Sequence, residues 1–295
     1  MKKAIIIFII ILALLSGSII LFTNKHLLEI NSSETFNSTD EILSIHYLDV
    51  GQGDAILIQT PNKTDILIDG GPDNSILNEL GKVMPFYDNT IDIIILTHPH
   101  SDHVVGLTEV LRRYQINKIY YTGVIHTSPD YIEWLKEIKK QNIQTIIIDE
   151  PILLELEKDI NLEFLYPFKS LNNKRVTEIN NTSIVNRLVY NEISFLFTGD
   201  AEIEVEEELM EHETQLSSSV LKAGHHGSHS SSSIDFIKQV NPEISIIQVG
   251  TDNKFNHPHL ITTKRLERLE IPTYRNDLLG TISIQTNGQI MQLSH

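Results

Sequence analysis

The chain has 295 residues, no cysteine and a formal net charge of −16. This length allows one large domain or two of average size, and 41% hydrophobic with 21% charged residues is typical of a globular protein. The lack of cysteine excludes disulfide scaffolds, cysteine nucleophiles and thiolate metal sites, so His, Asp, Glu or Asn must hold any metal ion. The acidic balance excludes a protein that coats nucleic acid by charge alone, because such binding depends on Lys and Arg.

Residues 1–23 are predicted to be a membrane signal. Lys2 and Lys3 precede the apolar run 4–22, which as a helix would be roughly 28 Å long, enough to cross a bilayer core. We expect an uncleaved, single-pass anchor that keeps both lysines in the cytoplasm and places the rest of the chain outside the cell. The alternative is a cleaved signal peptide and a secreted protein.

Residues 24–41 are polar and rich in Ser, Asn and Thr, which predicts a linker, and residues 42–295 are predicted to be the folded domain. Within this domain, apolar runs predict strands at 43–50, 55–59, 66–68, 91–96, 118–121, 145–148, 162–166, 183–190, 193–198, 220–223, 244–249, 281–285 and 289–293. Helical periodicity predicts helices at 104–114, 130–140, 202–212, 233–240 and 260–270. Two mixed halves of similar size favour an α/β domain with two stacked sheets and helices outside them.

The apolar strand predicted at 91–96 leads directly into His98, His100, Asp102 and His103, which form the pattern HxHxDH. Imidazole and carboxylate groups are ligands that suit zinc, manganese or iron. In an extended segment, His98 and His100 point to the same side, so one ion can bind both. The chain then turns into the next helix, where Asp102 and His103 can face a second ion. The motif therefore predicts a metal site.

HxHxDH after an apolar strand resembles the metallo-β-lactamase fold. Other segments follow in matching order: LDVGQGDA at 48–55, IDGG at 68–71, NNTS at 180–183, FTGDA at 197–201, LKAGHHGS at 221–228 and HPH at 257–259. Together they resemble the extracellular metallo-β-lactamase domain of the ComEC competence proteins, from about residue 43 to the C-terminus. The resemblance implies a four-layer αββα sandwich that binds two divalent ions, Zn or Mn.

The resemblance also implies ligands in the second half of the chain. Asp200 matches the aspartate that bridges the two ions, and one histidine of the GHHG segment supplies the last ligand. We expect His225, directly after the predicted strand, with His226 as the alternative. The implied ligands are thus His98, His100, Asp102, His103, Asp200 and His225. Asp69 is expected to accept a hydrogen bond from a ligand histidine, and Asn181 lies where many relatives carry a further histidine.

These ligands imply hydrolysis by a metal-bound hydroxide that Asp102 orients. His259 or His257 is expected to protonate the leaving oxygen, and Lys222 and Ser228 are expected to bind substrate. The implied substrate is an extracellular phosphodiester. Single-stranded DNA is favoured because the resembled domain is linked to degradation of one strand during DNA uptake. The sequence indicates no obligate protein partner.

Two other classes of function stay open. One is a hydrolase acting on a cell-wall or choline phosphodiester, or on a lactam, which a wall-binding repeat would favour. The other is a non-catalytic exported metal-binding protein, which loss of Asp200 or of the motif histidines would favour. The sequence has no such repeat and retains all of these residues.

Overall fold

The computed structural model describes residues 35–295, of which residues 37–295 form one compact unit. The predicted membrane anchor and most of the predicted linker lie outside the described residues. None of the helices within residues 35–295 is long and apolar enough to cross a membrane.

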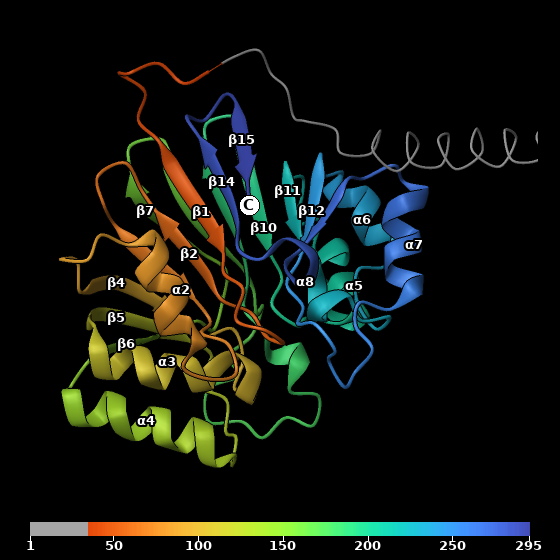
Figure 1. Cartoon of the computed structure of the whole chain (residues 1–295). Coiled ribbons are helices and arrows are strands. Elements are labelled where there is room, and N and C mark those ends of the chain that lie inside the picture. Colours follow the sequence, from red (N-terminus) through yellow and green to blue (C-terminus); the bar gives the residue numbers. More distant parts are fainter. Residues whose placement is uncertain (1–34) are drawn as a thin grey trace, which may run out of the picture. The chain divides into compact units, whose positions relative to one another are not determined.

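Two β-sheets form the centre of this unit, and helices cover their outer faces (Figure 1). The first sheet has the order β15-β14-β1-β2-β3-β4-β5-β6. Its strands are β1 (Leu43–Tyr47), β2 (Ile56–Gln59), β3 (Asp65–Ile68), β4 (Thr90–Ile95), β5 (Gln115–Tyr121), β6 (Gln144–Ile147), β14 (Ile282–Thr286) and β15 (Met291–Ser294). Its helices are α2 (Ser75–Val83), α3 (Ser101–Arg113) and α4 (Pro129–Gln141).

The second sheet has the order β13-β12-β11-β10-β9-β8-β7. Its strands are β7 (Ile152–Glu157), β8 (Ile160–Tyr166), β9 (Val185–Tyr190), β10 (Ile193–Phe197), β11 (Val220–Lys222), β12 (Ile244–Ile247) and β13 (Thr273–Arg275). The helices α5 (Ile203–Glu211), α6 (Ile234–Val240) and α7 (Leu260–Arg268) pack on it, and α8 (Asn276–Leu279) is a single short turn. The layers therefore follow the predicted αββα order.

Three apolar clusters hold these layers together. One lies between the two sheets, one between the first sheet and its helices, and one between the second sheet and its helices. Strands β3 and β10 are buried along their whole length because they are covered on both faces. This explains the nearly continuous apolar runs from which the central strands were predicted.

The structure differs from the sequence expectation at a few elements. Helix α2 and the strands β7 and β13 are not predicted. Gly81 weakens the helical signal of α2, and most side chains of the edge strand β7 are at least partly exposed. Helix α3 begins at Ser101, three residues before the predicted start, so Asp102 and His103 lie in its first turn.

Gly106 lies in α3, where the helix passes over the loop that follows β3. A Cβ at this position would lie 1.8 Å from the carbonyl oxygen of Gly70 and 2.9 Å from that of Asp73. These are backbone atoms that cannot swing aside. Gly106→Ala is therefore expected to lower the free energy of unfolding by about 1–3 kcal/mol, as measured by urea denaturation.

Gly81 provides the matched control, because it also lies inside a helix but a Cβ there would meet nothing within 4 Å. Gly81→Ala is expected to raise the free energy of unfolding by about 0.5–1 kcal/mol. Equal effects at the two positions would contradict the close approach of α3 to the Gly70 loop.

Candidate metal centre

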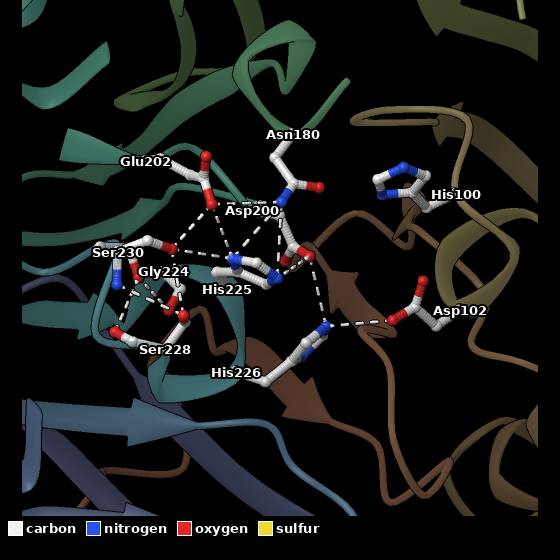
Figure 2. Close-up of polar contacts among 12 residues, drawn as sticks. His100, Asp102, Asn180, Asp200, Glu202, Gly224, His225, His226, Ser228 and Ser230 are labelled. Atoms are coloured by element: carbon white, nitrogen blue, oxygen red, sulfur yellow. Dashed lines mark hydrogen bonds and ion pairs between the residues drawn. The ribbon is translucent and has the colours of Figure 1, made fainter. Parts of the chain in front are cut away.

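The predicted ligands gather at one edge of the two sheets. Strands β3 and β4 are parallel, as are β10, β11 and β12, so their carboxyl ends lie at common edges. The HxHxDH segment follows β4, Asp200 follows β10, and the turn 224–227 follows β11. Figure 2 shows the side chains from these loops pointing toward one another.

Asp200 lies at the centre of this group. Its Oδ2 is 3.3 Å from Nε2 of His103 and 3.4 Å from Nε2 of His226. Nε2 of His226 is also 3.5 Å from Oδ2 of Asp102. One ligand atom from each of these four residues lies within 4.8 Å of all the others. Asp102 is the partly exposed member of the group, and the other three are buried.

His98 and His100 form a second pair beside this group. Nε2 of His98 lies 3.1 Å from Nδ1 of His100 and 3.9 Å from Oδ2 of Asp200. The two imidazoles thus face each other, as the alternation of an extended segment predicts. Asp200 lies between this pair and the group around His226.

Asp69 orients two of the predicted ligand histidines. Its Oδ2 accepts hydrogen bonds from Nδ1 of His103, at 2.8 Å, and from Oγ1 of Thr97, at 2.7 Å. The Thr97 oxygen in turn lies 3.1 Å from Nδ1 of His98. One buried carboxylate therefore fixes the Nδ1 side of both rings, so that the Nε2 atoms of both face Asp200. This is the supporting role expected for Asp69.

The turn that carries His225 and His226 has an unusual backbone. Both histidines have positive φ values, 47° and 52°, a conformation that is costly for residues other than glycine and that clusters at functional sites. Nδ1 of His226 donates to the carbonyl oxygen of Gln248 at 3.0 Å and lies 3.2 Å from Oδ1 of Asp54. These partners point Nε2 of His226 toward Asp200.

The side chain of His225 contacts a different set of residues. Its Nδ1 is 3.3 Å from Oε1 of Glu202 and 3.3 Å from Oγ of Ser230, and Nδ2 of Asn180 lies 3.4 Å away (Figure 2). Its Nε2 is 3.7 Å from Oδ2 of Asp200. The sequence expectation favoured His225 as the last ligand, whereas the structure brings His226 into the four-residue group.

The donor atoms in this group fit a divalent ion. Nε2 of His103, Nε2 of His226 and Oδ1 of Asp200 are buried, and no other described group forms a hydrogen bond with them. Such orphaned atoms are costly unless a ligand satisfies them. Burial alone would lower the pKa of both imidazoles, but Asp200 and its neighbouring carboxylates raise it well above the usual range. The pocket therefore strongly favours positive charge.

The structure contradicts the substrate-binding role predicted for Lys222. We expected it to bind substrate, but its side chain is fully buried, its ammonium pairs with Asp54, and Nζ donates to the carbonyl oxygen of Gly199 at 2.9 Å. The reason is that β11 is buried along its whole length, so a charge there needs an internal partner. Ser228 is likewise 3% exposed, with its Oγ 3.0 Å from Oγ of Ser230. Neither side chain is available to a substrate.

Asn181 also turns away from the ligands. Its Oδ1 accepts a hydrogen bond from the backbone N–H of Glu202 at 2.9 Å, and its Nδ2 donates to Glu204. The neighbouring Asn180 reaches His225 instead, and Ser183 places its Oγ 3.3 Å from Nδ1 of His98. The NNTS segment thus lies beside the site, with Asn180 and Ser183 facing the histidines.

His257 is the inner member of the HPH pair. Its ring centroid lies 5.4 Å from that of His225 and 6.3 Å from that of His226. Burial, together with the nearby His226 and His225, lowers the pKa of His257 to about 4, so its imidazole is neutral at neutral pH. His259 packs against the outer side of His257, and its Nδ1 accepts a hydrogen bond from the backbone N–H of His229 at 2.9 Å.

Sequence reasoning missed two supporting residues, Thr97 and Gln248, and marked Asp54 only as part of the LDVGQGDA segment. Thr97 links His98 to Asp69, Gln248 holds His226, and Asp54 joins His226 to Lys222. Asp54 lies in the LDVGQGDA segment, whose repeated glycines and aspartates were a usable signal. The other two are ordinary residues that follow buried strands, and nothing in their local sequence marks them.

Several known proteins are similar to this chain in sequence. The family model described as the metallo-beta-lactamase superfamily matches residues 48–250. ComE operon protein 3 of Bacillus subtilis is 27% identical over 263 residues, covering 83% of this chain and 33% of that protein. Competence protein ComA of Neisseria gonorrhoeae is 29% identical over 239 residues, covering 79% and 31%. The chain thus spans about a third of the length of these relatives.

Solved structures share the fold. A metallo hydrolase of the archaeon Ignicoccus hospitalis superposes with a TM-score of 0.53 at 15% identity, covering 81% of this chain and 98% of that one. CmlA, a diiron β-hydroxylase of Streptomyces venezuelae, gives a TM-score of 0.51 at 13% identity, covering 81% and 53%. At such low identity the likeness concerns the fold alone.

Replacing Lys222 tests its structural role. Lys222→Met would leave the buried Asp54 carboxylate without its cation, and we expect the free energy of unfolding to fall by about 3–5 kcal/mol. Lys238→Met, which breaks an exposed pair with Asp235, should change it by less than about 0.5 kcal/mol. Thermal or urea denaturation measures both. If Lys222→Met leaves the free energy of unfolding unchanged but weakens substrate binding, Lys222 binds substrate after all.

Proposed function

Because the chain belongs to the metallo-beta-lactamase superfamily, we propose that it is a metal-dependent hydrolase of phosphodiesters, with DNA as its main substrate. The observation that carries the proposal is the set of buried, unpartnered donor atoms on His103, Asp200 and His226. The fold class of this superfamily supports a metallo-hydrolase, and the substrate and location are inferences of our own.

We assign one divalent ion to Asp102, His103, Asp200 and His226, and a second to the side of Asp200 that faces the remaining two motif histidines, His98 and His100. Imidazole and carboxylate donors without thiolates suit zinc or manganese. When bound, such ions supply Lewis-acid chemistry that acidifies water and neutralises charge on substrate oxygens. His225 is left free of metal, with Glu202 holding its Nδ1.

Residues of the chain orient the ligands, orient the attacking water and stabilise the leaving oxygen. Asp69 and Thr97 keep the Nε2 atoms of His103 and His98 aimed at the site. Asp102, the partly exposed member of the group, accepts a hydrogen bond from the attacking water and orients it. His257 is neutral and lies beside the ligand turn, so its N–H stabilises negative charge developing on the leaving oxygen.

DNA is proposed as the substrate because the relatives are named as competence and recombination proteins. ComE operon protein 3, competence protein ComA and recombination protein 2 of Haemophilus influenzae all share this region. Competence and recombination both act on DNA, and a single DNA strand is a chain of phosphodiesters. The proposed extracellular location rests on the sequence of residues 1–23, where two lysines precede the apolar run.

Hydrolysis assays test the proposal. The purified full-length chain, loaded with Mn²⁺ or Zn²⁺, is expected to cleave bis-p-nitrophenyl phosphate and single-stranded DNA. Asp200→Asn should slow both reactions by at least about 100-fold, because a shared ligand matters more than the outer partners whose loss costs 10–100-fold. DNA cleavage should fall only weakly with salt, since a chain of net charge −16 offers few cations to phosphates.

Nitrocefin serves as the control substrate. Rapid nitrocefin hydrolysis by a metal-loaded chain that leaves the model diester and DNA intact would show a lactamase instead. A metal-loaded chain that cleaves none of these substrates would point to a binding protein.

A further inference from the structure

Phe255 lies at the rim of the candidate metal centre, in the loop between β12 and α7, and 46% of it is exposed. Its ring stacks on His257, with centroids 5.7 Å apart and planes inclined by 25°. His257 in turn packs against His225 and His226. One imidazole therefore connects this exposed ring to the turn that carries the metal ligand.

Hydrogen bonds hold this loop in place. The Asn253 amide donates to the carbonyl oxygens of Gly250, at 2.9 Å, and His257, at 2.7 Å, and its Oδ1 accepts from the His257 N–H at 2.9 Å. The N–H of His259 donates to the carbonyl oxygen of Gly227 at 2.9 Å. The backbone on both sides of Phe255 is thus held relative to the site before any substrate binds, which lowers the entropic cost of using the ring as a contact.

A cation accompanies the ring. Nζ of Lys254, an exposed side chain, lies 5.0 Å from the centroid of the Phe255 ring. An aromatic face beside a cation is the combination that proteins use to bind single strands, because every base offers a face for stacking. Since the whole chain carries a net charge of −16, long-range attraction to DNA is weak. Short-range contacts must therefore supply much of the affinity.

We propose that Phe255 is a stacking platform for a base of single-stranded DNA, next to the phosphodiester that lies over the metal centre; this proposal rests on the proposed function. The base lies against the ring where the Lys254 ammonium now sits, and Lys254 turns to a neighbouring phosphate. In a duplex both faces of a base are covered by its neighbours, so this contact selects single strands.

Binding to two strands of equal length and charge tests the platform. Fluorescence anisotropy would compare an oligothymidylate with an abasic sugar-phosphate strand, using the full-length, metal-loaded chain and phosphorothioate linkages in both strands so that neither is cleaved. The wild type should prefer the base-bearing strand by roughly 5- to 140-fold, the range for stacking of one base. Phe255→Leu, which keeps an apolar side chain, should remove this preference and leave binding of the abasic strand unchanged.

Two further variants complete the design. Phe86→Ala removes an aromatic side chain that is 98% exposed on the loop before β4, at the opposite end of that strand from the HxHxDH loop, and should keep the full preference. Phe255→Trp should also keep it, and its emission should be quenched by oligothymidylate but not by the abasic strand. The native Trp134 is fully buried in α4 and is expected to contribute no change.

The proposal is overturned if the wild type shows no preference for bases, or if Phe255→Leu retains it. These outcomes do not depend on whether the proposed hydrolase function is correct, because hydrolysis is measured separately. The metal-loaded wild type should hydrolyse bis-p-nitrophenyl phosphate whether or not Phe255 binds bases. If the wild type does not hydrolyse this diester, the proposed hydrolase function is wrong. The anisotropy measurements then still decide whether Phe255 binds bases.

Discussion

The carboxylate of Asp200 faces imidazole nitrogens from two segments of the chain, the HxHxDH loop and the turn after β11, and the rest of the site depends on this convergence. Its Oδ2 lies within 3.9 Å of Nε2 of His98, His103 and His226. Nε2 of His103, Nε2 of His226 and Oδ1 of Asp200 are buried without hydrogen-bond partners among the described residues. A buried cluster of donor atoms of this composition destabilises the folded chain unless positive charge fills it. The two stacked sheets supply the rigid edge that holds the donors together.

The supports of the site extend deep into the domain. Asp69 is fully buried and, through Thr97, controls two histidines from one position. On the other side, the buried pair of Asp54 and Lys222 stands behind His226. A buried charge without a partner at any of these positions would strongly destabilise the folded chain. Changes to these supports are therefore expected to affect folding and metal affinity together.

The sequence predicts the fold and the proximity of the HxHxDH side chains well, because both depend on local patterns. Continuous apolar runs mark the central strands, and HxHxDH places four donors in six residues. The choice between His225 and His226 was not predictable in this way, because it depends on two consecutive left-handed residues. The structural role of Lys222 could not be predicted either, because its partner Asp54 is far away in the sequence and contacts it only in the folded chain.

Counting the bound ions tests the account most directly. The full-length wild type, His226→Ala and His225→Ala would be dialysed against Mn²⁺ or Zn²⁺ and analysed by mass spectrometry for metal per chain. We predict that the wild type holds two ions, that His225→Ala keeps both, and that His226→Ala loses the ion shared with Asp102 and His103. Loss of an ion from His225→Ala, with full occupancy in His226→Ala, would contradict the arrangement of ligands described above.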